Sequence, residues 1–173
     1  SLPNMWKNGY LHGVTLCKRE TPMTTPIFNS VQECLEDLQA GRPIILVDDE
    51  DRENEGDLVM AAQFATPEWI NFMITHGKGL ICAPISAARA QQLNLPHMMS
   101  KNQSGHETAF TVSIEAKVGT TTGISAQDRA ITLANLCSAN ATADSFTRPG
   151  HLFPLIGKDG GVLERPGHTE ASL

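Results

Sequence analysis

The stretch from Ser30 to Val47 reads SVQECLEDLQAGRPIILV and contains the two kinds of segment from which the fold is expected to be built. Ser30 and Glu33 stand at the spacing of a helical capping box, apolar residues then recur at helical spacing, and Gly41 marks the expected end of the helix. Residues 43–47 follow as a short apolar strand. A helix that leads directly into a buried strand predicts an α/β or α+β protein.

The same two periodicities recur along the rest of the chain. They predict further helices over 66–77, 86–93 and 125–137, and further strands over 58–62, 80–85 and 108–115. The last of these alternates apolar and polar residues, as a strand with one buried face does. We therefore expect a single α/β (α+β) domain over residues 26–173, with a mixed sheet packed with helices. Residues 1–25 show neither period and are interpreted as a mobile N-terminal arm or a leftover of cloning.

Composition excludes several classes of protein. The 173 residues include 13 Lys and Arg against 19 Asp and Glu, which gives a net charge of −6 and no continuous basic stripe for nucleic acid. The longest wholly apolar run is far shorter than the roughly 18 residues of a membrane span. The four cysteines form no Cys-x-x-Cys pair, which is typical of reduced thiols in a cytoplasmic protein. We expect a cytoplasmic protein without nucleic acid or membrane partners.

Residues 48–57 read DDEDRENEGD and hold seven carboxylates between two apolar segments. Clustered carboxylates at the end of a strand favour a hard divalent cation with oxygen ligands. A calcium loop of the EF-hand type that starts at Asp51 would place Gly56 correctly at position six, but Ala62 stands at position twelve in place of Glu. The loop therefore predicts Mg²⁺ or Mn²⁺, with a solvated acidic turn as the alternative.

Two copies of Arg-Pro-Gly-His, at 148–151 and 165–168, are each expected to present an arginine and a histidine from a rigid bend. Two such bends predict a site that needs an anion clamp and an imidazole, although each histidine alone could be structural. Arg165 and Thr169 together suit a phosphate group. Residues 119–125, GTTTGIS, are a weaker second candidate for a phosphate cradle.

Four motifs carry a resemblance to a known family. Residues 48–57, 119–129 (GTTTGISAQDR), 148–155 (RPGHLFPL) and 160–171 (GGVLERPGHTEA) resemble, in order and spacing, 3,4-dihydroxy-2-butanone 4-phosphate synthase of riboflavin biosynthesis. The resemblance implies a homodimeric α/β lyase with sites near the subunit interface. It also implies conversion of D-ribulose 5-phosphate to L-3,4-dihydroxy-2-butanone 4-phosphate and formate, with Mg²⁺ or Mn²⁺ and no organic cofactor.

The resemblance also implies roles for individual residues. The metal would be held by Glu53 and His168, and His151 would be essential to catalysis. The substrate would be bound by Arg52, Glu53, Asp57, Arg165, Pro166, Gly167, His168 and Thr169. The chemistry expected is metal-assisted enediolate formation followed by skeletal rearrangement, in which Glu55 or Asp57 takes a proton and His151 delivers one.

In the family the chain continues past the residues that match Ala171, into a helix and a strand that carry a further glutamate of the site. The domain over 26–173 is therefore expected to lack its C-terminal end. Two alternatives follow for the function. One is a truncated, inactive chain that binds a sugar phosphate, and the other is a metal-dependent sugar-phosphate isomerase, which would share the early enediolate.

Overall fold

A computed structural model describes residues 15–17 and 28–173, and these form two compact units that meet in sequence between Phe64 and Ala65. Each unit is described by itself. Of the predicted N-terminal arm, Thr15–Cys17 form a short strand, β1. The rest of that arm lies outside the described residues, so its assignment stays a prediction.

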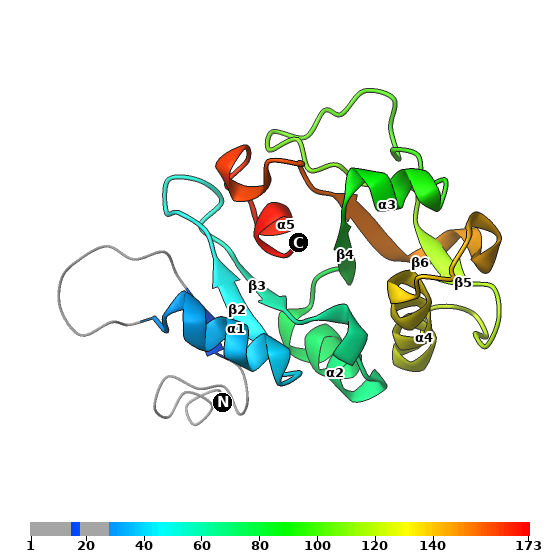
Figure 1. Ribbon diagram of the computed structural model, residues 1–173, viewed down its shortest axis with the longest axis horizontal. Coiled ribbons are helices and arrows are strands. Elements are labelled where there is room, and N and C mark those ends of the chain that lie inside the picture. The colour runs from blue at the N-terminus through cyan, green and yellow to red at the C-terminus, as the bar shows by residue number, and fades with distance from the viewer. Residues whose placement is uncertain (1–14, 18–27) are drawn as a thin grey trace. The chain divides into compact units, whose positions relative to one another are not determined.

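The first unit contains a three-stranded mixed sheet with β2 (Ile44–Val47) in the centre. β1 pairs with β2 in parallel, and β3 (Gly56–Val59) pairs with it antiparallel (Figure 1). Helix α1 (Val31–Gln39) contacts β1 and β2, and the short 3₁₀ helix η1 (Ala62–Phe64) ends the unit. The predicted helix and the strand that follows it are confirmed, and the strand predicted over 58–62 is observed as β3, which begins at Gly56 and ends at Val59.

Helix α1 begins and ends where the sequence predicts. The Ser30 N–H donates to Glu33 Oε2 at 2.8 Å, and the Glu33 N–H donates to Ser30 Oγ at 3.3 Å, which is the reciprocal capping box. Gly41 follows the helix with a φ of +74°, a left-handed conformation that glycine adopts without steric cost. Cys34, which is 2% exposed, packs from the helix against Ile44 of β2 and forms the centre of this unit's core.

The second unit is built around β6 (Phe146–Ile156), the long strand between β4 (Cys82–Ile85) and β5 (Ile114–Ala116) in Figure 1. β4 pairs with β6 in parallel and β5 pairs with it antiparallel. The predicted α/β (α+β) class with mixed pairing is therefore confirmed, and the described residues form two three-stranded sheets where the sequence analysis expected one mixed sheet.

The other elements of this unit are helical: α2 (Pro67–Phe72), the π-helical turn η2 (Met73–Gly77), α3 (Ala87–Gln92), α4 (Ala126–Cys137), η3 (Ala143–Ser145), η4 (Gly161–Leu163) and α5 (His168–Ala171). Among the described residues, no helix is both long and apolar enough to cross a membrane.

Helix α4 fixes the position of β5. Its buried Thr132 hydroxyl accepts a hydrogen bond from the Ala116 N–H at 3.0 Å and donates one to the Asp128 carbonyl at 2.9 Å. Ile114 of β5 and Leu152 of β6 are completely buried. The strand pair that carries Glu115 and His151 is therefore held by both packing and hydrogen bonds.

The predicted strand over 108–115 forms regular structure only near its end, and the expected burial pattern is wrong. Thr111 and Ser113, expected on a solvent face, are buried. The Thr111 hydroxyl donates to the Pro154 carbonyl at 3.1 Å, and Ser113 Oγ accepts from the Gly150 N–H at 3.1 Å. The buried hydroxyls satisfy backbone groups of β6, which explains why polar residues face the core here.

The first Arg-Pro-Gly-His copy lies inside β6, so the prediction of a bend is wrong for residues 148–151. The Arg148 guanidinium donates to the backbone carbonyls of Leu93, Ala143 and Phe146 at 2.7, 3.1 and 3.2 Å. It braces three backbone carbonyls, and the anion-clamp role expected from the sequence stays a prediction for Arg148.

Candidate active site

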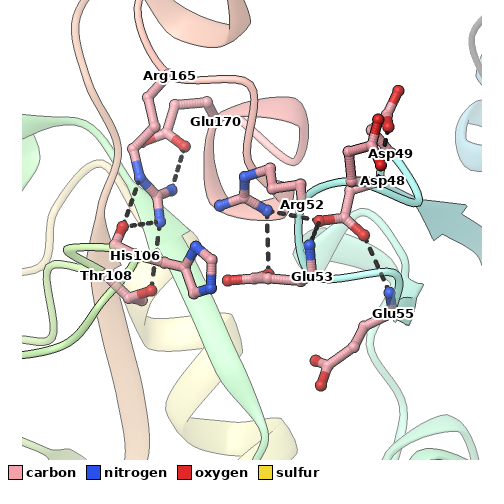
Figure 2. A network of polar contacts seen from close by, with 10 residues as sticks. Asp48, Asp49, Arg52, Glu53, Glu55, His106, Thr108, Arg165 and Glu170 are labelled. Atoms are coloured by element: carbon pink, nitrogen blue, oxygen red, sulfur yellow. Dashed lines mark hydrogen bonds and ion pairs between the residues drawn. The ribbon is translucent and has the colours of Figure 1, made fainter.

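The acidic loop connects β2 to β3 and folds around the carboxylate of Asp48, directly after β2. Asp48 Oδ2 accepts hydrogen bonds from Arg52 Nη1 at 2.7 Å and from the Glu53 N–H at 3.0 Å, and Oδ1 accepts one from the Glu55 N–H at 3.0 Å (Figure 2). The sequence analysis missed this role. The signal that could have found it is an aspartate at the start of a short loop, where its oxygens reach the following backbone amides.

Arg52 supplies a positive charge among these carboxylates. Its Nη1 lies 2.7 Å from Asp48 Oδ2 and 3.0 Å from Glu53 Oε2. Partial burial disfavours the charged guanidinium, but the hydrogen bond to Asp48 and the charges of both carboxylates outweigh burial and raise the pKa of Arg52. Arg52 thereby holds the carboxylates of Glu53 and Asp48 close to one nitrogen atom.

The two candidate bases lie at the end of this loop and in the next strand. The Glu55 backbone bonds with Asp48, and Asp57 lies in β3 opposite Leu46 of β2. Both residues are exposed. The hairpin thus presents two exposed carboxylates, and a carboxylate is one of the groups that can act as a general base.

In the second unit, the second Arg-Pro-Gly-His copy leads into α5, which begins at His168. The Arg165 Nη1 donates to Glu170 Oε2 at 2.6 Å, and its Nε and Nη2 donate to the His106 carbonyl at 3.1 and 2.7 Å (Figure 2). Glu170 is buried and also accepts from the Lys158 N–H at 3.1 Å. The sequence analysis missed Glu170, which fixes the arginine predicted to bind phosphate.

His151 of β6 has a partner that the sequence analysis also missed. Its Nδ1 lies 2.9 Å from Oε2 of Glu115, in the neighbouring strand β5. The two residues are 36 positions apart in sequence, so no local pattern could connect them. The predicted pairing of Glu53 with His168 joins residues of the two different units and stays a prediction.

The loop over 119–125 is fixed by Asp128, near the start of α4. The Asp128 carboxylate accepts from the Thr121 hydroxyl at 2.8 Å, the Thr121 N–H at 3.1 Å and the Gly123 N–H at 3.0 Å. The hydrogen bond from the Thr121 hydroxyl is the main reason that the pKa of Asp128 lies below its ordinary value, although burial opposes the shift. Because Asp128 occupies these two amides, the prediction of a phosphate cradle is wrong for them.

Replacing Asp128 by Asn is expected to lower the stability of the second unit, because an amide cannot accept all three hydrogen bonds as well as a carboxylate does. A carboxyl group with a lowered folded-state pKa stabilises the fold above its unfolded-state pKa, about 3.9, and this contribution is lost as the pH falls. The difference in melting temperature between the wild type and Asp128→Asn should therefore be largest near pH 7 and shrink below about pH 4.

Thermal denaturation followed by circular dichroism at several pH values measures this difference. The control is Asp144→Asn, which makes the same change at an exposed aspartate. A melting temperature of Asp128→Asn equal to that of the wild type at pH 7 would contradict the prediction.

Comparison with known proteins supplies the family. The family model of 3,4-dihydroxy-2-butanone 4-phosphate synthase matches residues 32–173. The riboflavin biosynthesis protein RibBA of Bacillus mycoides (strain KBAB4) is 54% identical over 147 residues, which cover 85% of this chain and 37% of that protein. The bifunctional riboflavin biosynthesis protein RIBA 1, chloroplastic, of Arabidopsis thaliana is 51% identical over 156 residues, 89% of this chain and 29% of that protein. The chain thus spans about a third of the length of these curated relatives.

Solved structures agree with this match. A 3,4-dihydroxy-2-butanone 4-phosphate synthase in complex with two magnesium ions superimposes with a TM-score of 0.82 at 44% identity, over 84% of this chain and 68% of that one. RibBX, a two-domain 3,4-dihydroxy-2-butanone 4-phosphate synthase from A. baumannii, superimposes with a TM-score of 0.78 at 51% identity, over 82% of this chain and 42% of that one. Since the family model covers nearly all described residues and the fold agrees, the chain belongs to the 3,4-dihydroxy-2-butanone 4-phosphate synthase family.

Proposed function

We propose that the protein is a lyase that converts D-ribulose 5-phosphate to L-3,4-dihydroxy-2-butanone 4-phosphate and formate, in cytoplasmic riboflavin biosynthesis. The observation that carries this proposal is the family match over residues 32–173, which includes the acidic loop and both Arg-Pro-Gly-His motifs. The names of the relatives, which refer to riboflavin biosynthesis, support the pathway. A homodimer belongs to the same proposal, and size-exclusion chromatography with light scattering tests it.

Glu53 and His168 are proposed to hold a divalent cation, Mg²⁺ or Mn²⁺. The donor chemistry fits such an ion, because Mg²⁺ is usually bound through one or two carboxylates together with water and substrate oxygens, and imidazole is a common metal ligand. Arg52 fixes the Glu53 carboxylate within the loop at 3.0 Å. When bound, the cation would polarise substrate oxygens and make the adjacent C–H group more acidic.

The side chains of the hairpin and of β6 then move protons. Either Glu55 or Asp57 takes the proton from the acidified carbon, because both are exposed carboxylates beside the loop. Arg52 and the proposed base Asp57 also bind the sugar. His151 supplies a proton during the rearrangement that ends in formate release, since histidine is the side chain that acts most often as a general acid or base. None of these steps calls for an organic cofactor.

Residues Arg165, Pro166, Gly167, His168 and Thr169 are proposed to bind the phosphate end of the substrate. The charge of Arg165 is fixed in place by Glu170 and by the His106 carbonyl, so its orientation is set before a ligand arrives. To contact phosphate, the guanidinium must either share its N–H donors between the phosphate and these acceptors or give up one acceptor. A pre-oriented planar cation of this kind is well suited to a phosphate group.

Replacing Arg165 by Ala is expected to raise KM for the sugar phosphate at least about tenfold, which corresponds to about 1.4 kcal/mol, and to change kcat less. The physical reason is that the phosphate is remote from the reacting carbons, so its binding contributes equally before and during the reaction. Steady-state kinetics measures both constants. The control is Arg42→Ala, which removes an exposed arginine from the first unit, and an unchanged KM in Arg165→Ala would refute the phosphate role.

Formate release tests the proposed function directly. Purified protein is incubated with D-ribulose 5-phosphate and MgCl₂, and formate is measured with formate dehydrogenase, with EDTA in a parallel sample. We expect formate and the four-carbon phosphate in equal amounts, and none with EDTA. Folded protein that releases no formate would refute the lyase. A five-carbon product would then indicate an isomerase, and calorimetric binding without any product would indicate a sugar-phosphate-binding chain.

A further inference from the structure

Glu115 and His151 form a carboxylate and imidazole pair, of which the proposed catalytic scheme uses only the histidine. The distance from His151 Nδ1 to Glu115 Oε2 is 2.9 Å, and the side chains are 43% and 21% exposed, respectively. The carboxylate is thus the more sheltered partner, and the imidazole is the one that extends toward solvent. An ionised carboxylate only accepts hydrogen bonds, so Nδ1 carries the hydrogen and Nε2 of the neutral ring becomes the acceptor.

The backbone around this pair is arranged to bring the two side chains together. Ile114 pairs with Leu152 while Glu115 pairs with Thr147, so the ladder between β5 and β6 is interrupted where His151 lies. Gly150 permits this close approach, since a Cβ atom there would lie 2.1 Å from the backbone carbon of Ile114. The irregular register therefore requires a glycine next to the histidine.

A second glycine lies against the pair itself. A Cβ atom on Gly123 would lie 1.7 Å from Glu115 Oε2 and 2.7 Å from His151 Nδ1. The φ of Gly123 is +85°, and its N–H donates to Asp128 at 3.0 Å, so the segment cannot easily move away. The backbone at Gly123 thus lies against the contact between the carboxylate and Nδ1, and a side chain at this position would collide with both groups.

We propose that Glu115 is a positioning residue that holds His151 in the Nδ1–H tautomer and directs Nε2 outward as the atom that carries the proton in the reaction. This inference rests on the proposed function, because it assigns the orientation of the proposed catalytic histidine. Glu115 acts through His151 and is not assigned a contact with the substrate. Removing a group that orients a functional histidine in a metal site typically lowers activity about 10- to 100-fold. Removing the aspartate that orients the histidine of a Ser-His-Asp triad lowers kcat by more than this.

The experiment uses the whole chain labelled with ¹⁵N at histidine, the Glu115→Gln variant and the control Glu36→Gln, an exposed glutamate of α1. Long-range ¹H–¹⁵N spectra identify the protonated ring nitrogen of His151, whose signals are assigned by their loss in His151→Asn. We expect the neutral ring to be protonated at Nδ1 in the wild type and less so in Glu115→Gln. We also expect kcat for formate release to fall about 10- to 100-fold in Glu115→Gln, with KM within about twofold of the wild type.

The tautomer does not depend on turnover, so the two proposals can fail separately. A wild-type ring protonated at Nε2 would overturn the positioning role, even if the Glu115→Gln variant did not fold. A kcat of Glu115→Gln equal to that of the wild type would overturn it as well. Absence of formate release from the wild type would instead refute the proposed function, while the spectra would still decide whether Glu115 sets the tautomer.

Discussion

Replacing Glu53 by Gln is expected to abolish Mg²⁺-dependent formate release, with a loss of activity greater than about 100-fold. The reason is the loss of the negative charge that attracts the cation. Removing a group that only orients a metal ligand typically lowers activity about 10- to 100-fold, and removing a direct ligand should lower it further. Gln keeps the size of the side chain, and its carbonyl oxygen can still accept from Arg52. The loop should stay folded, because Asp48 holds it through the backbone of Glu53 and Glu55.

The matched control for this variant is Glu50→Gln, which makes the same change in charge at an exposed position of the same loop. Formate release and Mn²⁺ binding, followed by electron paramagnetic resonance, are measured on both variants. We expect both properties to be lost in Glu53→Gln and retained in Glu50→Gln. Equal losses in the two variants would mean that the loop acts through its total charge, and near wild-type activity in Glu53→Gln would refute the metal assignment.

Replacing His168 by Ala is expected to have an effect of similar size, for a different physical reason. The change removes a neutral nitrogen ligand and leaves the charge of the acidic loop unaltered. The fold should tolerate it, because alanine favours helix at the start of α5 and because Ser172 bonds to the backbone carbonyl of His168 at 2.7 Å. We therefore expect a folded protein whose Mn²⁺ affinity and formate release are both strongly reduced.

The control for His168→Ala is His97→Ala, at an exposed histidine elsewhere in the second unit. Circular dichroism checks the fold of both variants, and Mn²⁺ titration and steady-state kinetics measure their function. Unchanged Mn²⁺ affinity with greatly reduced turnover would assign His168 to the substrate alone. If Mn²⁺ binding and turnover both matched the wild type, the solvated acidic turn would remain as the interpretation of residues 48–57.

Local sequence predicted the local structure well. The Ser30 and Glu33 box, Thr66 with Pro67, and Ser125 each begin a helix in the structure, because a cap involves side chains and amides only a few residues apart. The order of the four motifs was sufficient to predict the family, and the family match over residues 32–173 confirms that prediction.

The two Arg-Pro-Gly-His copies illustrate where local reasoning ends. Their sequences are identical, yet Arg148 braces three backbone carbonyls from within β6, whereas Arg165 pairs with Glu170 just before α5. A local pattern cannot distinguish these outcomes, since each guanidinium bonds to whatever groups the surrounding fold brings near it. Tertiary packing therefore decides which copy is structural.

The sequence by itself determined the helix starts, the apolar strands, the carboxylate-rich loop and the family. Only the tertiary structure decided that Glu115 contacts His151 across 36 residues, and that Arg165 reaches the His106 carbonyl across 59. The physical reason is range, because caps and periodicity depend on neighbours within a few residues. The partner of a polar side chain depends instead on how distant segments pack, and on the need to satisfy every buried donor and acceptor.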